Sequence, residues 1–117
     1  MKYIDKEERP WGRYFVVHDE PDYKIKRIEV NPKARSSYQF HMKRSETWTI
    51  INGSGIVTVD GIDKELRKGD SIKIKKESKH RIENNGDSDL VFIEVQTGTY
   101  FVEDDIVRIE DDYNRLD

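Results

Sequence analysis

Residues 39–53 read QFHMKRSETWTIING and hold the clearest structural pattern in the chain. A run rich in β-branched and aromatic residues, 46–51, leads directly into Asn52-Gly53, a pair typical of two-residue hairpin turns. Another apolar run, 56–59, follows soon after this turn. The stretch therefore predicts two antiparallel strands joined by a tight turn.

Strand and turn signals continue on both sides of this hairpin. Further strands are expected at residues 25–30, 62–66, 72–74 and 90–95, separated by turn pairs such as Asp60-Gly61 and Gly69-Asp70. These signals recur roughly every 8–16 residues, and no segment shows a sustained helical repeat of apolar residues. The pattern predicts an all-β sandwich or small barrel. One helical turn is expected at residues 5–9, while the acidic tail, residues 104–117, either wraps the surface or frays.

Length and composition restrict the class of protein. The 117 residues predict one domain spanning 1–117. There is no cysteine, which excludes disulfides, thiolate nucleophiles and cysteine-ligated zinc. The 21 basic and 24 acidic residues give a formal net charge of −3, which argues against nucleic-acid binding. Because no apolar run nears the ~20 residues of a membrane span and no hydrophobic leader begins the chain, we expect a cytoplasmic protein without membrane contact.

Two groups of polar residues have a regular spacing. Gln39 and His41 are two residues apart, so on a strand their side chains share one face, and Glu46 follows five residues later. The spacing resembles the two-part motif of the cupin family, G-x5-H-x-H-x4-E-x6-G and G-x5-P-x-G-x2-H-x3-N. The matching positions here are Lys33, Gln39, His41, Glu46 and Gly53 in the first part, and Gly69, Lys75, Glu77, His80 and Asn84 in the second. The departures Lys33, Lys75 and Glu77 fall at turn positions, which suggests altered turns and an intact site.

Further segments narrow the resemblance to one branch of the cupins. The chain from Arg9 to Arg115 is similar to the type II mannose-6-phosphate isomerase family, in which glutamine occupies the position of Gln39. The segments that carry this likeness are residues 9–12 (RPWG), 23–28 (YKIKRI), 39–41 (QFH), 44–48 (RSETW), 94–100 (EVQTGTY), 103–108 (EDDIVR) and 110–113 (EDDY). The likeness implies an all-β cupin double-stranded β-helix, a jelly-roll-like barrel with a metal site inside its mouth.

The resemblance also implies the composition of this metal site. The ligands would be Gln39, His41, Glu46 and His80, which together offer two imidazoles, a carboxylate and an amide oxygen. Such a set suits one divalent ion, with zinc as the first choice and iron, manganese or nickel as alternatives. Next to the two neighbouring oxygens of a sugar, the ion would polarise the carbonyl group and stabilise an enediolate during aldose–ketose isomerisation.

A phosphosugar substrate requires cationic groups as well. Arg44 and Arg108 stand where the family carries arginines. Lys26 and Arg27 point to opposite faces of their expected strand, so one of the two can reach the barrel interior. We expect Arg44, Arg108 and Lys26 to be catalytic residues; for each arginine the alternative is a surface ion pair. The sequence does not specify the general base, for which a metal-bound hydroxide, Lys26 and Glu94 are all candidates.

Metal-dependent interconversion of mannose 6-phosphate and fructose 6-phosphate, a step toward nucleotide sugars, is the predicted function. The partner would be a phosphosugar, and a homodimer formed through open strand edges is expected. Relatives often carry histidine where this chain has Met42, Lys43 and Thr47, so a lost imidazole could abolish catalysis. Two alternatives follow, an isomerase or epimerase for another sugar and a metal- and sugar-binding cupin without turnover. Because the chain has no G-x-G-x-x-x-R nucleotide loop, guanylyltransferase activity is not expected.

Overall fold

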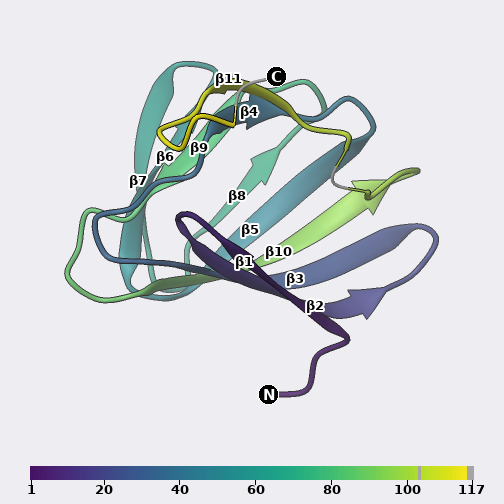
Figure 1. Cartoon of the computed structure of the whole chain (residues 1–117), viewed down its shortest axis with the longest axis horizontal. Helices are drawn as coiled ribbons and strands as arrows, with labels where there is room; N and C mark the ends of the chain where they lie inside the picture. The colour runs from purple at the N-terminus through teal and green to yellow at the C-terminus, as the bar shows by residue number, and fades with distance from the viewer. Residues whose placement is uncertain (103, 116–117) are drawn as a thin grey trace.

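Two β-sheets packed face to face make up the described part of the molecule (Figure 1). The computed structural model describes residues 1–102 and 104–115. The strands in chain order are β1 (Asp5–Arg9), β2 (Gly12–Asp19), β3 (Tyr23–Val30), β4 (Tyr38–Phe40), β5 (Arg44–Asn52), β6 (Ser54–Val59), β7 (Ile62–Arg67), β8 (Ser71–Ile74), β9 (His80–Glu83), β10 (Leu90–Gly98) and β11 (Val107–Glu110). Within these residues, no helix has the length and apolar character that crossing a membrane requires.

The predicted strands are confirmed, but the hairpin predicted at Asn52-Gly53 is wrong. β5 pairs with β10 and β8, whereas β6 pairs with β7 and β9, so the turn at Asn52-Gly53 connects the two sheets. A turn signal specifies a change of chain direction and leaves the pairing partner of each strand open. The first sheet has the strand order β1-β2-β3-β10-β5-β8, and the second has the order β11-β4-β9-β6-β7. β6 and β7 pair from Ser54↔Arg67 to Val59↔Ile62 and are joined by Asp60-Gly61. Both turn residues have positive φ, 48° at Asp60 and 81° at Gly61, as the type I′ hairpin turn requires.

The predictions for the two ends of the chain had different outcomes. The helical turn expected at residues 5–9 is wrong, because these residues form β1 and pair with β2 from Asp5↔Val16 to Arg9↔Gly12. A segment this short has little helical stability of its own, so the complete hairpin ladder prevails. At the other end, residues 104–115 of the acidic tail follow the surface, since β11 pairs with β4; residues 116–117 lie outside the described residues.

The apolar core lies between the two sheets. Its buried members are Tyr14, Val16, Ile28, Val30, Trp48, Ile50, Val57, Leu66, Ile74, Ile82, Leu90 and Phe92. Alternate side chains of β5 face this core, and along that row the character changes from apolar Ile50 and Trp48 to polar Glu46 and Arg44. One end of the space between the sheets is therefore apolar, and the other end is polar.

The neighbouring strands β3 and β10 also have buried polar side chains at this end, directly opposite one another and opposite those of β5. Lys26 in β3 lies opposite Glu94 in β10, and Gln96 in β10 lies opposite Glu46 in β5. All four of these side chains are buried. Because the burial of polar groups costs free energy unless they are paired, their collection at one end marks the candidate functional site.

Candidate metal centre

His41, Glu46 and His80 converge at the polar end of the core. Glu46 lies on β5 in the first sheet, His80 lies on β9 in the second, and His41 follows directly after β4. Their ligand atoms all lie within 4.8 Å of one another. Nε2 of His41 is 3.4 Å from Oε2 of Glu46, and Nε2 of His80 is 3.8 Å from Oε1. Three of the four residues predicted as metal ligands are thus brought together.

Hydrogen bonds on the far side of each imidazole fix its tautomer. Nδ1 of His41 lies 2.7 Å from the backbone carbonyl oxygen of Asp105, and Nδ1 of His80 lies 2.9 Å from that of Ser78. A carbonyl oxygen only accepts, so both rings carry hydrogen on Nδ1 and turn the lone pair of Nε2 toward Glu46. A backbone carbonyl is a common orienting partner of metal-ligating histidines.

The ionisation states of the two histidines also suit metal ligation. Burial, followed by the positive charge of Arg44, lowers the pKa of His41 to about 4. Burial lowers the pKa of His80 as well. Nε2 of His80 is buried and has no hydrogen-bond partner among the described residues, which proteins rarely tolerate without a reason. Two neutral imidazoles and a carboxylate, with this nitrogen facing them, fit a divalent metal ion.

The predicted fourth ligand, Gln39, lies on β4 opposite His80 in β9. Its amide oxygen accepts a hydrogen bond of 2.7 Å from Oγ of Ser37. The side chain also lines the cavity that contains Arg44. Ligation by Gln39 stays a prediction, and a neutral amide oxygen is the weakest donor of the predicted set for a zinc-like ion.

Gln39→His provides a test of this fourth position. We expect zinc binding to tighten by about threefold to tenfold, because an imidazole nitrogen replaces the amide oxygen. Titration of metal-free protein against a chromophoric chelator measures the change. Ser37→Ala is the control, since it removes the partner of the amide oxygen without adding a ligand. An affinity no better than the parental one would mean that residue 39 does not reach the ion.

Arg44 is buried against the triad, with 4% of its surface exposed. Its Nε donates to Oε2 of Glu46 over 2.9 Å, and its Nη2 lies 3.3 Å from Nε2 of His41. The interpretation of Arg44 as a surface ion pair is therefore wrong. A permanent positive charge stands beside the ligand atoms, where it can stabilise negative charge on a bound oxygen atom.

A second carboxylate lies close to Glu46. Nε1 of Trp48 is 3.1 Å from Oε1 of Glu46 and 3.0 Å from Oε1 of Glu94, so a single N–H bridges the two carboxylates. Nε2 of Gln96 donates to Oε2 of Glu94 over 2.7 Å. Burial, and then the charge of Glu46, raises the pKa of Glu94 to about 7. A carboxyl group with this pKa can accept and return a proton near neutral pH.

A cavity of about 80 Å³ adjoins this cluster. Its lining consists of Arg9, Trp11, Tyr14, Lys26, Ile28, Gln39, Arg44, Glu94, Ile106 and Arg108. The three basic residues predicted to be catalytic thus line one cavity. Nζ of Lys26 lies 4.0 Å and the guanidinium carbon of Arg9 lies 5.1 Å from the centre of the Tyr14 ring. With four cationic side chains and one carboxylate, the lining suits an anionic ligand.

Sequence reasoning missed the placement of Arg9, Gln96 and Asp105 at the site. Arg9 and Gln96 belong to the RPWG and EVQTGTY segments that carried the family resemblance, and those segments were the available signal. Asp105 contacts His41 through its backbone carbonyl, which every residue has, so no side-chain pattern could point to it.

Comparison with known proteins identifies the family. Residues 2–111 match the family described as "Mannose-6-phosphate isomerase C-terminal". The chain belongs to this family. A similar member of the curated proteins is the mannose-1-phosphate guanylyltransferase ManC of Salmonella typhimurium strain LT2, which is 42% identical over 108 residues. This match covers 92% of the chain and 22% of ManC, so the chain spans about a fifth of the length of that relative.

Solved structures show that this member of the mannose-6-phosphate isomerase C-terminal family has the double-stranded β-helix fold. An uncharacterised conserved protein with a double-stranded β-helix domain, from Klebsiella pneumoniae, superposes with a TM-score of 0.72 at 23% identity over 82% of each chain. The capsular polysaccharide assembling protein CapF from Staphylococcus aureus gives a TM-score of 0.83 at 19% identity, over 94% of this chain and 33% of CapF. The fold prediction is confirmed.

The positions where relatives often carry histidine lie outside the cavity lining. Thr47 is exposed on β5, since the inward row of that strand contains Glu46 and Trp48. Met42 is exposed as well. Nζ of Lys43 lies 4.5 Å from the centre of the Tyr100 ring. An imidazole at residue 47 would point away from the triad, so its replacement by threonine leaves the ligand cluster intact.

Proposed function

We propose that this chain is a metal-dependent aldose–ketose isomerase that interconverts mannose 6-phosphate and fructose 6-phosphate. The observation that carries the proposal is Arg44, whose guanidinium contacts two residues of the triad and also lines the cation-rich cavity. An ion ligated by the triad and an anion held in the cavity would therefore be neighbours. The family description supports the choice of a hexose phosphate.

The reaction moves one proton between adjacent carbon atoms. A base removes the proton from C2 of the aldose and returns it to C1, while the hydroxyl hydrogen of O2 passes to O1. When bound, a divalent ion supplies Lewis-acid polarisation of the carbonyl group. Arg44 donates hydrogen bonds to the oxygen on which negative charge develops. Arg9, Lys26 and Arg108 provide the cationic groups for the phosphate.

We assign the proton transfer to Glu94 among the candidate bases. Its carboxylate lines the cavity and is held at one oxygen by Trp48 and at the other by Gln96. Lys26 is less suited, because its Nζ lies 4.0 Å from the centre of the Tyr14 ring and makes a cation–π contact there. An ammonium group has no lone pair with which to accept a proton.

A coupled isomerase assay on metal-depleted protein tests the proposal. Zinc, iron(II), manganese and nickel are added back one at a time, with mannose 6-phosphate, glucose 6-phosphate and unphosphorylated mannose as substrates. We expect turnover of mannose 6-phosphate that requires an added ion, and at least about tenfold lower kcat/KM for mannose because the cationic contacts are lost. Turnover of another sugar alone would indicate a different isomerase or epimerase, and bound metal without any turnover would indicate a binding module.

Two further parts of the proposal concern the surroundings of the protein. The cytoplasm is the compartment where a hexose phosphate would be met, and a homodimer through open strand edges is the expected assembly. β1 and β8 are the edges of the first sheet, and Ile4, just before β1, is exposed. Sedimentation analysis of the purified chain measures the assembly.

A further inference from the structure

The C-terminal strap, residues 104–112, contacts the body of the molecule at several points. Through β11 it pairs with β4, with Val107 opposite Phe40 and Arg108 opposite Gln39. Figure 1 shows this segment, in yellow, running beside β4 at the edge of the second sheet. The strap thus runs along the strand that leads into the metal ligand His41.

Asp105 makes three of these contacts by itself. Its backbone carbonyl oxygen accepts from Nδ1 of His41 over 2.7 Å. Its carboxylate accepts from two successive backbone N–H groups, with Oδ1 3.1 Å from that of Met42 and Oδ2 2.9 Å from that of Lys43. The same residue therefore orients the imidazole of His41 and holds the turn between His41 and Arg44.

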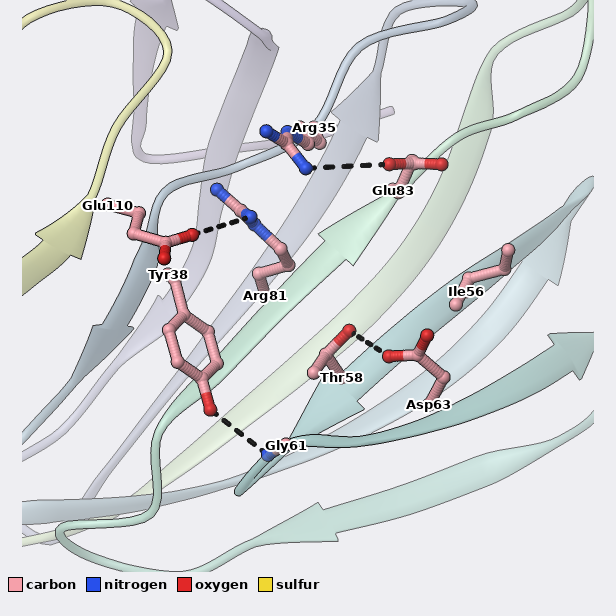
Figure 2. A pocket seen from close by; sticks show the side chains of 9 residues that line it. All are labelled: Arg35, Tyr38, Ile56, Thr58, Gly61, Asp63, Arg81, Glu83 and Glu110. Carbon is pink, nitrogen blue, oxygen red and sulfur yellow. Dashed lines mark hydrogen bonds and ion pairs between the residues drawn. The ribbon is translucent and has the colours of Figure 1, made fainter.

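The far end of the strap is fixed on the outer face of the second sheet. Nη1 of Arg81 lies 3.4 Å from Oε2 of Glu110. Figure 2 shows this ion pair as a dashed line. Asp112 binds Arg35 in a bidentate manner, with N–O distances of 2.6 and 2.9 Å. Between these outer contacts and Asp105, the strap brings Arg108 to the cavity lining.

We propose that the C-terminal strap completes the metal centre and that Asp105 is its positioning residue. The inference rests on the metal site of the proposed function, and it adds a residue outside the ligand set. The carbonyl of Asp105 selects the tautomer that presents Nε2 of His41, and the carboxylate holds that carbonyl in place. Orienting partners of metal ligands typically contribute about 10- to 100-fold to metal affinity.

Both carboxylate oxygens are needed for this role. Each of them accepts from a different backbone N–H group. An asparagine offers one acceptor oxygen, and its NH₂ group would face the second N–H, donor against donor. Asp105→Asn therefore removes one hydrogen bond and sets a second donor against a backbone N–H group, which destabilises the bound position of the strap. The size of the side chain is unchanged.

The test is a titration of metal-free protein with Co²⁺ alone, followed by its visible absorption spectrum. Asp105→Asn is expected to weaken Co²⁺ binding by about 10- to 100-fold and to alter the spectrum of the bound ion. Asp112→Asn, which removes one of the two contacts between the far end of the strap and Arg35, should lower the affinity in the same direction by a smaller factor. Asp70→Asn is the matched control, because Asp70 also accepts from a backbone N–H at a turn, that of Arg67 at 2.8 Å, but lies outside the strap and the cavity lining.

Parental affinity and spectrum in Asp105→Asn would overturn the proposal, as would an equal loss in Asp70→Asn. If Asp105→Asn does not fold, as judged from the melting temperature of the metal-free protein, Asp112→Asn decides, and parental affinity there overturns the proposal. The readout does not require catalysis. A parent chain that binds Co²⁺ but isomerises no sugar would contradict the proposed function without contradicting the role proposed for the strap. A parent chain that binds no Co²⁺ would contradict both proposals.

Discussion

His80→Ala is expected to weaken zinc binding by about 100- to 1,000-fold and to reduce isomerase activity to background. Structural zinc sites with four ligands have binding free energies of about 10–16 kcal/mol, so one ligand accounts for roughly 3–4 kcal/mol. His80 contributes the Nε2 atom that is buried and has no hydrogen-bond partner among the described residues. Its loss therefore removes a ligand that has no other evident use. Chelator competition on metal-free protein measures the affinity.

His18→Ala is the control for this prediction. His18 is half exposed, its Nδ1 lies 2.7 Å from the hydroxyl oxygen of Tyr23, and it belongs to neither the triad nor the cavity lining. The control should bind zinc as the parent does. Because alanine at residue 80 also leaves a small cavity, the melting temperature is compared in the metal-free state, where a cavity effect persists and a ligand effect does not. Equal zinc affinity in His80→Ala and the parent would remove His80 from the site.

The fold could be predicted because its signals are local. Asp60-Gly61 specifies a hairpin within a few residues, and the strands beside it follow from the alternation of side chains. Asn52-Gly53 marks a turn, but the strands on either side of it lie in different sheets, and no local signal specifies that arrangement. The segment at residues 5–9 failed for the opposite reason. Its state depends on pairing with β2, and a five-residue charged sequence carries no signal for that partner.

Two turns have a left-handed backbone conformation that their residue types do not predict. Lys33 and Glu77 replace motif glycines, and altered turns were the expectation. Both residues instead have positive φ, 62° and 66°, which is the left-handed conformation that glycine favours. The Glu77 turn also donates its backbone N–H to the carbonyl oxygen of His41, over 2.7 Å. The turn geometry is thus kept at a cost of about 1–2 kcal/mol per residue, and it supports the ligand loop.

The candidate site was predictable only in part. Alternation along one strand places Arg44 and Glu46 on the same face, so their contact follows from the sequence. The meeting of Glu46 with His80 depends on the packing of two sheets, which spacing cannot specify and which only the family resemblance implied. The carboxylate pair bridged by Trp48 depends on the register of β5 and β10, and no local pattern encodes that register.

Arg44→Lys is expected to lower kcat/KM by about 10- to 1,000-fold, on the order of 1.4–4 kcal/mol of transition-state stabilisation. The guanidinium donates to Glu46 through Nε and lies near His41 through Nη2, so two of its nitrogen atoms contact different residues of the triad. A lysine keeps the charge but has a single nitrogen, which cannot hold both directions and still face the substrate. Steady-state kinetics with mannose 6-phosphate measures the loss.

The alternative to a catalytic role for Arg44 is a purely structural one, in which the residue forms a buried ion pair. Under that interpretation Arg44→Lys would lower the melting temperature and the metal content, and turnover per bound metal ion would stay near the parental value. Arg13→Lys is the matched control, because Nη1 of Arg13 is paired with Glu29 at 3.0 Å and Arg13 is not among the residues that line the cavity. We expect the control to change kcat/KM by less than about twofold, because the Arg13–Glu29 pair is a partly exposed contact outside the cavity lining. Parental turnover per metal ion in Arg44→Lys would exclude the guanidinium from the chemistry, because the charge alone would then be sufficient.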